Sequence, residues 1–133
     1  MNWKLWFLTS FFSIYTIIVG QLPFEIRQIP TDKPWVAITF DDGPTKYTES
    51  ILKILKKHDA KASFFLQAKH VEIYPNEAIN IYADGHSVGN HGYQHDHIEQ
   101  KSPKELIQMI AKSQLVFFET FDFMPRFYRP AYS

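Results

Sequence analysis

The sequence predicts an α/β domain with a parallel sheet, of the kind found in (β/α) barrels. Short apolar runs alternate along the chain with amphipathic stretches, which favours repeated strand–helix units. The first of these, residues 35–40, is a continuous apolar run, as expected for a strand covered on both faces. Polar clusters follow the ends of these runs, where parallel barrels carry their reactive groups. At 133 residues the chain has room for one such domain.

Composition excludes several classes of function. The 14 Lys and Arg residues balance 14 Asp and Glu residues, so the chain has no basic field to gather nucleic acid, and no nucleic-acid partner is expected. The absence of cysteine excludes a disulfide scaffold, a thiolate metal site and a cysteine nucleophile. Aromatic residues make up 17% of the chain, which supports a packed core and also suits a site that stacks on sugar rings.

Residues 1–20 have the character of an export leader. One lysine, Lys4, precedes a nearly apolar stretch over residues 5–20. We interpret residues 1–20 as a signal peptide or an N-terminal membrane anchor, and expect the protein to be secreted or held at the outer face of the membrane. No small-residue cleavage motif follows, which slightly favours the anchor, and a buried core helix is the remaining alternative. Residues 21–34, with three prolines, form a lead-in segment.

The domain itself is expected over residues 35–133, and its first part contains two strands and a helix. Residues 35–40 are a continuous apolar run that ends at a turn sequence, which predicts a strand buried on both faces. Residues 48–58 place apolar positions on one face and lysines on the other, which predicts a helix. Residues 62–66 are expected to form a second short buried strand.

Two more strands and two more helices are expected in the second part. Residues 76–83 form a helix that Gly85 ends, and residues 86–90 form a weaker third strand. Residues 102–105 supply an N-cap serine, a proline at the first helical position and the glutamate of a capping box, so a long helix begins there. Residues 126–129 are expected to form a fourth strand.

Two adjacent carboxylates follow the first predicted strand. Asp41 and Asp42 leave the backbone in different directions, so one can ligate a metal ion while the other faces the water bound to it. Gly43 and Pro44 supply a sharp turn at this point. A plain turn is the alternative interpretation, and it loses weight because a histidine pair lies downstream.

His91 and His95 follow the third predicted strand and lie four residues apart. On a helical turn they would share a face and could hold one ion together with Asp42. Imidazole nitrogens and a carboxylate oxygen suit zinc or a related divalent metal. For the histidine pair taken alone, an incidental arrangement is the alternative. His86 and His97 are out of step with the pair, and we interpret them as structural or exposed.

A metal ion at this site would lower the pKa of its bound water towards about 7. Asp41 is then the candidate base that takes the proton of this water. Arg129, the last residue of the fourth predicted strand, is the candidate partner that orients the Asp41 carboxylate, because a guanidinium is a planar donor. A surface arginine is the alternative interpretation of Arg129.

Three segments of the chain match the motifs of one family. Residues 39–44 read Thr-Phe-Asp-Asp-Gly-Pro and match its first motif in full. Residues 91–95 supply the histidine pair of its second motif. Residues 129–133 read Arg-Pro-Ala-Tyr-Ser and match three positions of the third motif, which is usually Arg-Pro-Pro-Tyr-Gly. The chain therefore closely resembles the polysaccharide deacetylases of the NodB-homology type, carbohydrate esterase family 4.

The resemblance implies a distorted (β/α) barrel, of which residues 35–133 would be the N-terminal part. It implies hydrolysis of N-acetyl groups from an amino-sugar polysaccharide, peptidoglycan first and chitin-like oligomers next, with release of acetate. Asp41 would be the catalytic base, Arg129 its partner, and the main-chain N–H of Tyr132 would face the oxyanion. The family also implies a divalent metal, zinc being the expected ion, with three ligands: Asp42, His91 and His95.

The chain also departs from the family pattern. Gly92 replaces a Ser or Thr that helps to fix the loop, and Ala131 and Ser133 replace Pro and Gly. The family's later Asp-Trp and Leu-x-His motifs are absent, and the second of these supplies the general acid. The sequence therefore predicts a truncated domain with an exposed sheet edge. The alternative function is an inactive metal- or glycan-binding half-domain. An aspartate-based phosphatase fits less well, because its two aspartates lie two residues apart. The oligomeric state is left open.

Overall fold

The computed structural model describes residues 32–132. The chain divides into a first unit, Met1–Trp35, and a second unit, Val36–Ser133, and the second holds every helix and strand of the described residues. The expected leader over residues 1–20 and most of the lead-in segment lie outside the described residues. Within residues 32–132, no helix combines the length and the apolar character needed to cross a membrane.

A three-stranded parallel sheet forms the centre of the second unit, which confirms the expected α/β class. The strands are β1 (Thr39–Asp41), β2 (Ser63–Leu66) and β3 (Ser87–Asn90), in the spatial order β1-β2-β3. Helix α2 (Thr48–Lys57) connects β1 to β2. Helices α3 (Ala68–Ile73) and α4 (Pro75–Ala83) connect β2 to β3. After β3 come a short 3-10 helix, η1 (Ile98–Gln100), and the long helix α5 (Pro103–Phe121).

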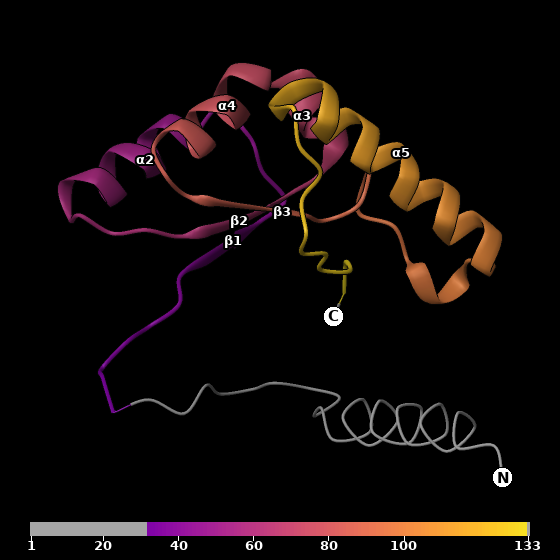
Figure 1. Cartoon of the computed structure of the whole chain (residues 1–133), viewed down its shortest axis with the longest axis horizontal. Coiled ribbons are helices and arrows are strands. Elements are labelled where there is room, and N and C mark those ends of the chain that lie inside the picture. The colour runs from indigo at the N-terminus through magenta and orange to yellow at the C-terminus, as the bar shows by residue number, and fades with distance from the viewer. Residues whose placement is uncertain (1–31, 133) are drawn as a thin grey trace, which may run out of the picture. The chain divides into compact units, whose positions relative to one another are not determined.

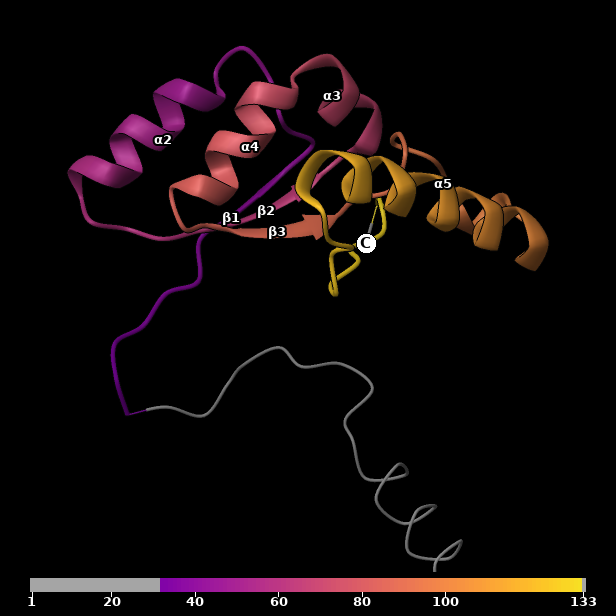
Figure 2. The ribbon, with the colours of Figure 1, turned by 45° about the horizontal axis from the view of Figure 1, so that its top comes forward.

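The four α-helices of residues 32–132 cover the same face of the sheet (Figures 1 and 2). Along β2 the side chains alternate, so Phe64 and Leu66 point into the layer between sheet and helices and are buried. Helices α3 and α5 pack against each other, as do α2 and α4. The buried apolar core consists of Leu52, Leu55, Ala62, Phe64, Leu66, Ala68, Val71, Ala78, Ile81, Val88, Val116 and Phe117.

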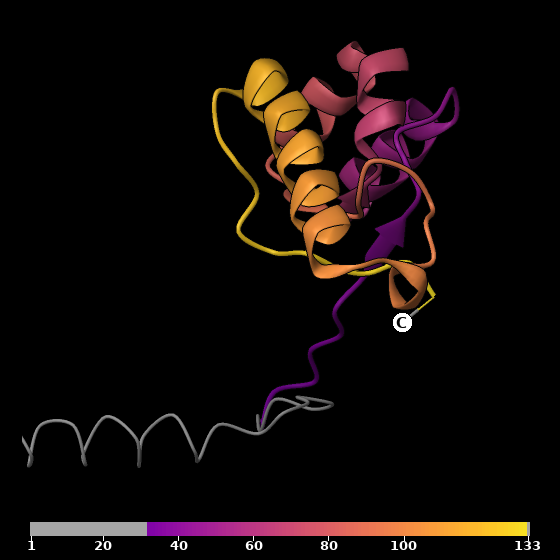
Figure 3. The same ribbon diagram turned by 90° about the vertical axis from the view of Figure 1, so that its right-hand side faces the viewer.

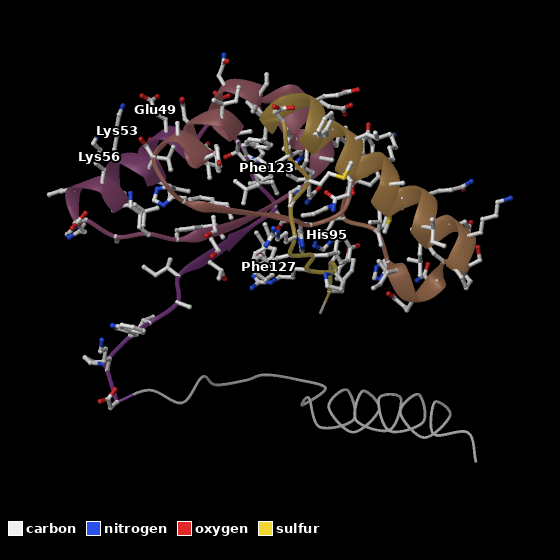
Figure 4. The ribbon with its side chains drawn as sticks, in the orientation of Figure 1. Glu49, Lys53, Lys56, His95, Phe123 and Phe127 are labelled. Carbon is white, nitrogen blue, oxygen red and sulfur yellow. The ribbon has the colours of Figure 1, made fainter. Side chains whose placement is uncertain are left out.

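Helix α2 is amphipathic, as its sequence pattern predicts. Leu52 and Leu55 are buried, while Glu49 and Lys53 form an ion pair of 2.7 Å on the outer surface. Figure 4 shows both charged side chains pointing away from the sheet. Such an exposed pair contributes little to stability, so the helix depends on the apolar face that it buries.

Helix α5 begins with the capping box that the sequence predicts. The Ser102 hydroxyl accepts a hydrogen bond from the main-chain N–H of Glu105, and the Glu105 carboxylate accepts one from the main-chain N–H of Ser102. On its inner side α5 buries Val116 and Phe117 in the core. The helix ends at Phe121, and the cap residue Asp122 that follows has a φ of 60°, in the left-handed region.

The opposite face of the sheet is open and carries two rows of residues in register. One row is made of hydroxyl side chains: Thr39, Ser63 and Ser87. The next row, one pleat nearer the carboxyl ends of the strands, consists of Asp41, Phe65 and Gly89. Gly89 leaves room for the Phe65 ring, because a Cβ at this position would lie 2.6 Å from Cδ1 of Phe65.

Two expected strands differ from the structure. The first is present but shorter than predicted, because β1 covers only Thr39–Asp41. Its expected burial on both faces is wrong: Val36 is 86% exposed, because within residues 32–132 β1 pairs with β2 alone. Residues 126–129 form a single bridge between Tyr128 and Asn90. Prolines at positions 125 and 130 flank this segment and cannot donate to a longer ladder. Figure 3 shows the segment leaving the end of α5 and running back to the sheet.

Candidate metal and catalytic site

The predicted site residues meet at the carboxyl ends of the three strands. Asp41 is the last residue of β1, and His91 directly follows β3. The loop after β3 carries His95, which Figure 4 places near the final segment of the chain. Together they line one hollow, whose wall consists of Asp41, Asp42, His91, His95, Arg129, Pro130 and Tyr132.

The two adjacent carboxylates point to different partners. Asp41 accepts a hydrogen bond of 2.7 Å at Oδ1 from Nη1 of Arg129. The same Arg129 nitrogen donates to the Thr39 hydroxyl at 3.2 Å, and the guanidinium carbon lies 3.9 Å from the centre of the Phe65 ring. The structure therefore brings Arg129 to Asp41 and holds its guanidinium on the open face of the sheet.

Asp42 faces the histidine pair instead. Its φ of 69° lies in the left-handed region, which turns its side chain away from that of Asp41. Nε2 of His91 lies 3.5 Å from Oδ1 of Asp42, and Nε2 of His95 lies 3.7 Å from the same oxygen. Ligand atoms that each sit about 2.0–2.2 Å from a tetrahedral zinc are about 3.4 Å apart. The donor set therefore fits one shared divalent ion.

The surroundings of His91 determine which of its nitrogens is available. The His91 side chain is buried, and its Nδ1 donates to the main-chain carbonyl of Arg129 at 2.7 Å. Because a carbonyl only accepts, Nδ1 carries a proton, and Nε2 is the nitrogen that faces Asp42 and whose lone pair a metal ion would take in the neutral ring. A hydrogen bond of this kind on the second nitrogen is the usual support of a metal-binding histidine.

The expected helical turn under the histidine pair is wrong, because residues 91–97 form a loop. Asn90, fully buried, shapes this loop: its Oδ1 accepts from the Gly92 N–H at 2.7 Å, and its Nδ2 donates to the Ser113 hydroxyl at 2.8 Å. Gly92 has a φ of 91°, a conformation that glycine adopts without strain. The glycine that departs from the family motif thus suits the loop of this chain.

Tyr132 forms the outer wall of the hollow. Its ring lies edge-on to His95, with 4.3 Å between ring centres, and stacks on His97 at 3.9 Å. Nδ1 of His97 also lies 2.7 Å from Oε1 of Glu99, so His97 packs beside the site and is held there by two neighbours.

Tyr128 has a perturbed hydroxyl. Burial raises the pKa of this hydroxyl, and the charge of Asp96 adds to the effect.

His86 lies apart from the site, in a structural position. It is 5% exposed, its Nδ1 accepts from the main-chain N–H of Ala62 at 3.3 Å, and its ring lies against Phe64. Burial lowers the pKa of this imidazole, the nearby Lys61 lowers it further, and Asp84 acts in the opposite direction. We therefore expect a neutral His86 in the folded chain at neutral pH.

Sequence reasoning missed two residues that hold Asp42. Nε2 of Gln67 donates to Oδ1 of Asp42 at 2.6 Å, and Nδ1 of His70 donates to the Asp42 main-chain carbonyl at 2.6 Å. Neither residue belongs to a recognisable motif. Polar Gln67 directly after the apolar β2 was the only sequence signal, since that position is where a reactive group is expected.

Comparison with known proteins gives a consistent set of similarities. The sequence model of a family described as "Polysaccharide deacetylase" matches residues 28–133. A peptidoglycan-N-acetylglucosamine deacetylase of Bacillus cereus is 38% identical over 104 residues, which are 77% of this chain and 38% of that protein. The peptidoglycan-N-acetylmuramic acid deacetylase PdaC of Bacillus subtilis is 36% identical over 115 residues, 86% of this chain and 24% of that protein.

A solved structure of a deacetylase is similar to this chain in fold as well as in sequence. The crystal structure of a peptidoglycan N-acetylglucosamine deacetylase in complex with a hydroxamate-type benzamide superimposes with a TM-score of 0.73 at 38% identity. The match covers 77% of this chain and 49% of that chain. The chain thus spans about half of this structural relative and 38% of the first curated one.

Proposed function

Because the chain belongs to the polysaccharide deacetylase family, we propose that it hydrolyses N-acetyl groups of an amino-sugar polysaccharide and releases acetate. One observation carries the proposal. The ligand atoms of Asp42, His91 and His95 lie within 4.8 Å of one another, directly beside the Asp41–Arg129 pair. A carboxylate base next to a three-ligand cluster is the arrangement that metal-assisted amide hydrolysis requires.

In this proposal Asp42, His91 and His95 hold a divalent ion, zinc being favoured by one carboxylate and two imidazole donors. A bound zinc ion polarises a carbonyl and lowers the pKa of water. Asp41 takes a proton from the attacking water and can pass it to the amine nitrogen as the C–N bond breaks. Arg129 keeps the Asp41 carboxylate in place through its 2.7 Å bond. The main-chain N–H of Tyr132 is assigned to the oxyanion that forms at the carbonyl oxygen of the amide when water adds to its carbon.

Peptidoglycan is the proposed substrate, with chitin-like oligomers second. Two relatives carry names that refer to peptidoglycan, one to its N-acetylglucosamine and one to its N-acetylmuramic acid. The site fits a long polymer because it is open at the edge of the sheet, and the exposed Tyr132 ring offers a face to a sugar. Action on a cell wall agrees with the expected export through residues 1–20.

The test is acetate release from N-acetylated peptidoglycan and from chitooligosaccharides by the purified chain. Acetate is expected to appear with the unsubstituted chain, to stop when a chelator removes the metal, and to return when zinc is added. Asp41→Asn is expected to abolish release. Asp59→Asn is the matched control, because Asp59 is also an exposed aspartate but lies in the turn after α2.

The possible outcomes separate the two candidate functions. Zinc binding without acetate release from either substrate would support the metal- or glycan-binding alternative and overturn the enzymatic proposal. Acetate release that persists after both the chelator and Asp41→Asn would show that the proposed mechanism is wrong.

A further inference from the structure

Two residues at the start of helix α3 bind Asp42, one at the Asp42 side chain and the other at the Asp42 main chain. Gln67 donates from Nε2 to the Asp42 carboxylate at 2.6 Å, and His70 donates from Nδ1 to the Asp42 carbonyl at 2.6 Å. A third bond of 3.0 Å runs from the main-chain N–H of Gln67 to the carbonyl of Gly43. The segment after β2 is thus joined at three points to the segment after β1.

Asp42 needs such support because little else restrains it. Its side chain is 57% exposed, and an exposed carboxylate samples several rotamers. Gln67, by contrast, is 6% exposed and is fixed by the start of α3. The buried amide therefore sets the position of the exposed carboxylate, and not the reverse.

We propose that Gln67 and His70 are positioning residues for Asp42, which set how tightly this chain binds a divalent ion. The inference rests on the metal site of the proposed function. Gln67 places Oδ1 of Asp42 near the two histidine nitrogens, at 3.5 and 3.7 Å. His70 stabilises the left-handed backbone of Asp42, from which the side chain can reach them.

The two residues act at different atoms, so their variants have different expected effects. Gln67→Leu keeps a similar volume but removes the donor to the carboxylate. His70→Leu removes the donor to the carbonyl, whereas His70→Gln can still donate from its amide and is expected to retain most of the affinity. A residue that only filled space would not distinguish Leu from Gln at position 70.

The experiment measures zinc affinity by competition with a chromophoric chelator, using the full chain. Gln67→Leu is expected to weaken binding by about 10- to 100-fold, as is usual when a partner of a metal ligand is removed. The visible absorption of the cobalt-substituted chain reports ligand geometry directly and is expected to change as well. Gln108→Leu, at an exposed position on α5, is the matched control and is expected to leave both readouts unchanged.

Folding is checked separately by circular dichroism of each metal-free variant, and Gln67→Met serves as a second apolar substitution. A Gln67→Leu or Gln67→Met chain that folds and binds zinc with unchanged affinity and an unchanged cobalt spectrum would overturn the positioning role alone. If the unsubstituted chain bound no zinc, the metal site of the proposed function would fail first, and the positioning role with it.

Discussion

The guanidinium of Arg129 binds the carboxylate of Asp41 across 88 positions of sequence, with 2.7 Å between Nη1 and Oδ1. Arg129 is held in turn by two other groups, the Thr39 hydroxyl and the face of Phe65. Its own main-chain N–H donates to the carbonyl of Asn90 at 2.9 Å. The orientation of the proposed base thus depends on one arginine that is fixed at both ends.

Arg129→Lys is predicted to reduce deacetylation and leave zinc affinity unchanged. A lysine keeps the charge, but it cannot donate in the planar geometry that serves Asp41 and Thr39 together. We expect kcat/KM to fall by about 10²-fold, the lower end of what a well-placed base contributes. Zinc affinity is retained because the bond to His91 uses the Arg129 carbonyl, which a side-chain change leaves in place. Full activity of the lysine variant would count against a role for Arg129 in orienting Asp41.

Gly89→Ala is predicted to destabilise the fold and to disturb Arg129. The added Cβ would lie 2.6 Å from the Phe65 ring, so the ring must move, and Arg129 loses the surface on which it rests. Forcing a methyl group into such a packed contact costs about 1–3 kcal/mol. Denaturant unfolding of the variant measures this loss.

A double substitution tests the cause of that loss. Phe65→Leu provides space for the new methyl group, so Gly89→Ala should cost less stability in the Phe65→Leu background than in the unsubstituted chain. Equal costs in both backgrounds would show that the clash with Phe65 is not responsible.

His86 is predicted to make the stability of the fold depend on pH. Its pKa in the folded chain lies below the ordinary value of 6.5, chiefly because of burial, so protons bind to the unfolded chain first as the pH falls. The stability contribution is therefore complete above pH 6.5 and is lost progressively below it. We expect the free energy of unfolding to decline as the pH drops from 6.5.

His86→Asn isolates this effect. The asparagine oxygen can accept the bond from Ala62 that Nδ1 of His86 accepts now, while asparagine does not titrate in this range. Unfolding measured at several pH values should show a smaller slope below pH 6.5 for the variant. Identical slopes would mean that the other histidines account for the pH dependence.

Ser102→Ala is predicted to affect stability alone. It removes the hydroxyl that caps α5, at an expected cost of about 1 kcal/mol. Acetate release is expected to stay unchanged at temperatures below the unfolding transition, because the capping box does not touch the site residues. A change in zinc affinity would instead reveal a coupling between the start of α5 and the loop after β3 that carries His95.

The sequence allowed the locally determined features to be predicted. The capping box at residues 102–105 needs only residues three apart, and α2 needs only its apolar spacing. The two carboxylates and the histidine pair were identified by motif, and the structure places them together. Their local backbone was predicted wrongly, because His91 and His95 converge through a loop fixed by Asn90 and not through a helical turn.

Features that depend on distant neighbours could not be predicted. Helix α3 is six residues long with two buried residues, Ala68 and Val71, which is too short a pattern to detect; its packing on α5 supports it. The apolar run at residues 35–40 suggested burial, but burial depends on a neighbour for β1 that residues 32–132 do not include. The bond from Gln67 to Asp42 produces no periodic pattern in the sequence, since it joins the segments that follow β2 and β1.

The long span between Asp41 and Arg129 also has a consequence for how the chain reaches its native state. Closing a loop of this length costs conformational entropy before any contact is gained, so the site should be assembled after the local helices. We expect cobalt absorption to recover more slowly than helical circular dichroism when the chain refolds with cobalt present. Simultaneous recovery of both signals would show that Asp42 meets His91 and His95 as early as the helices form, and that the site helps to nucleate the fold.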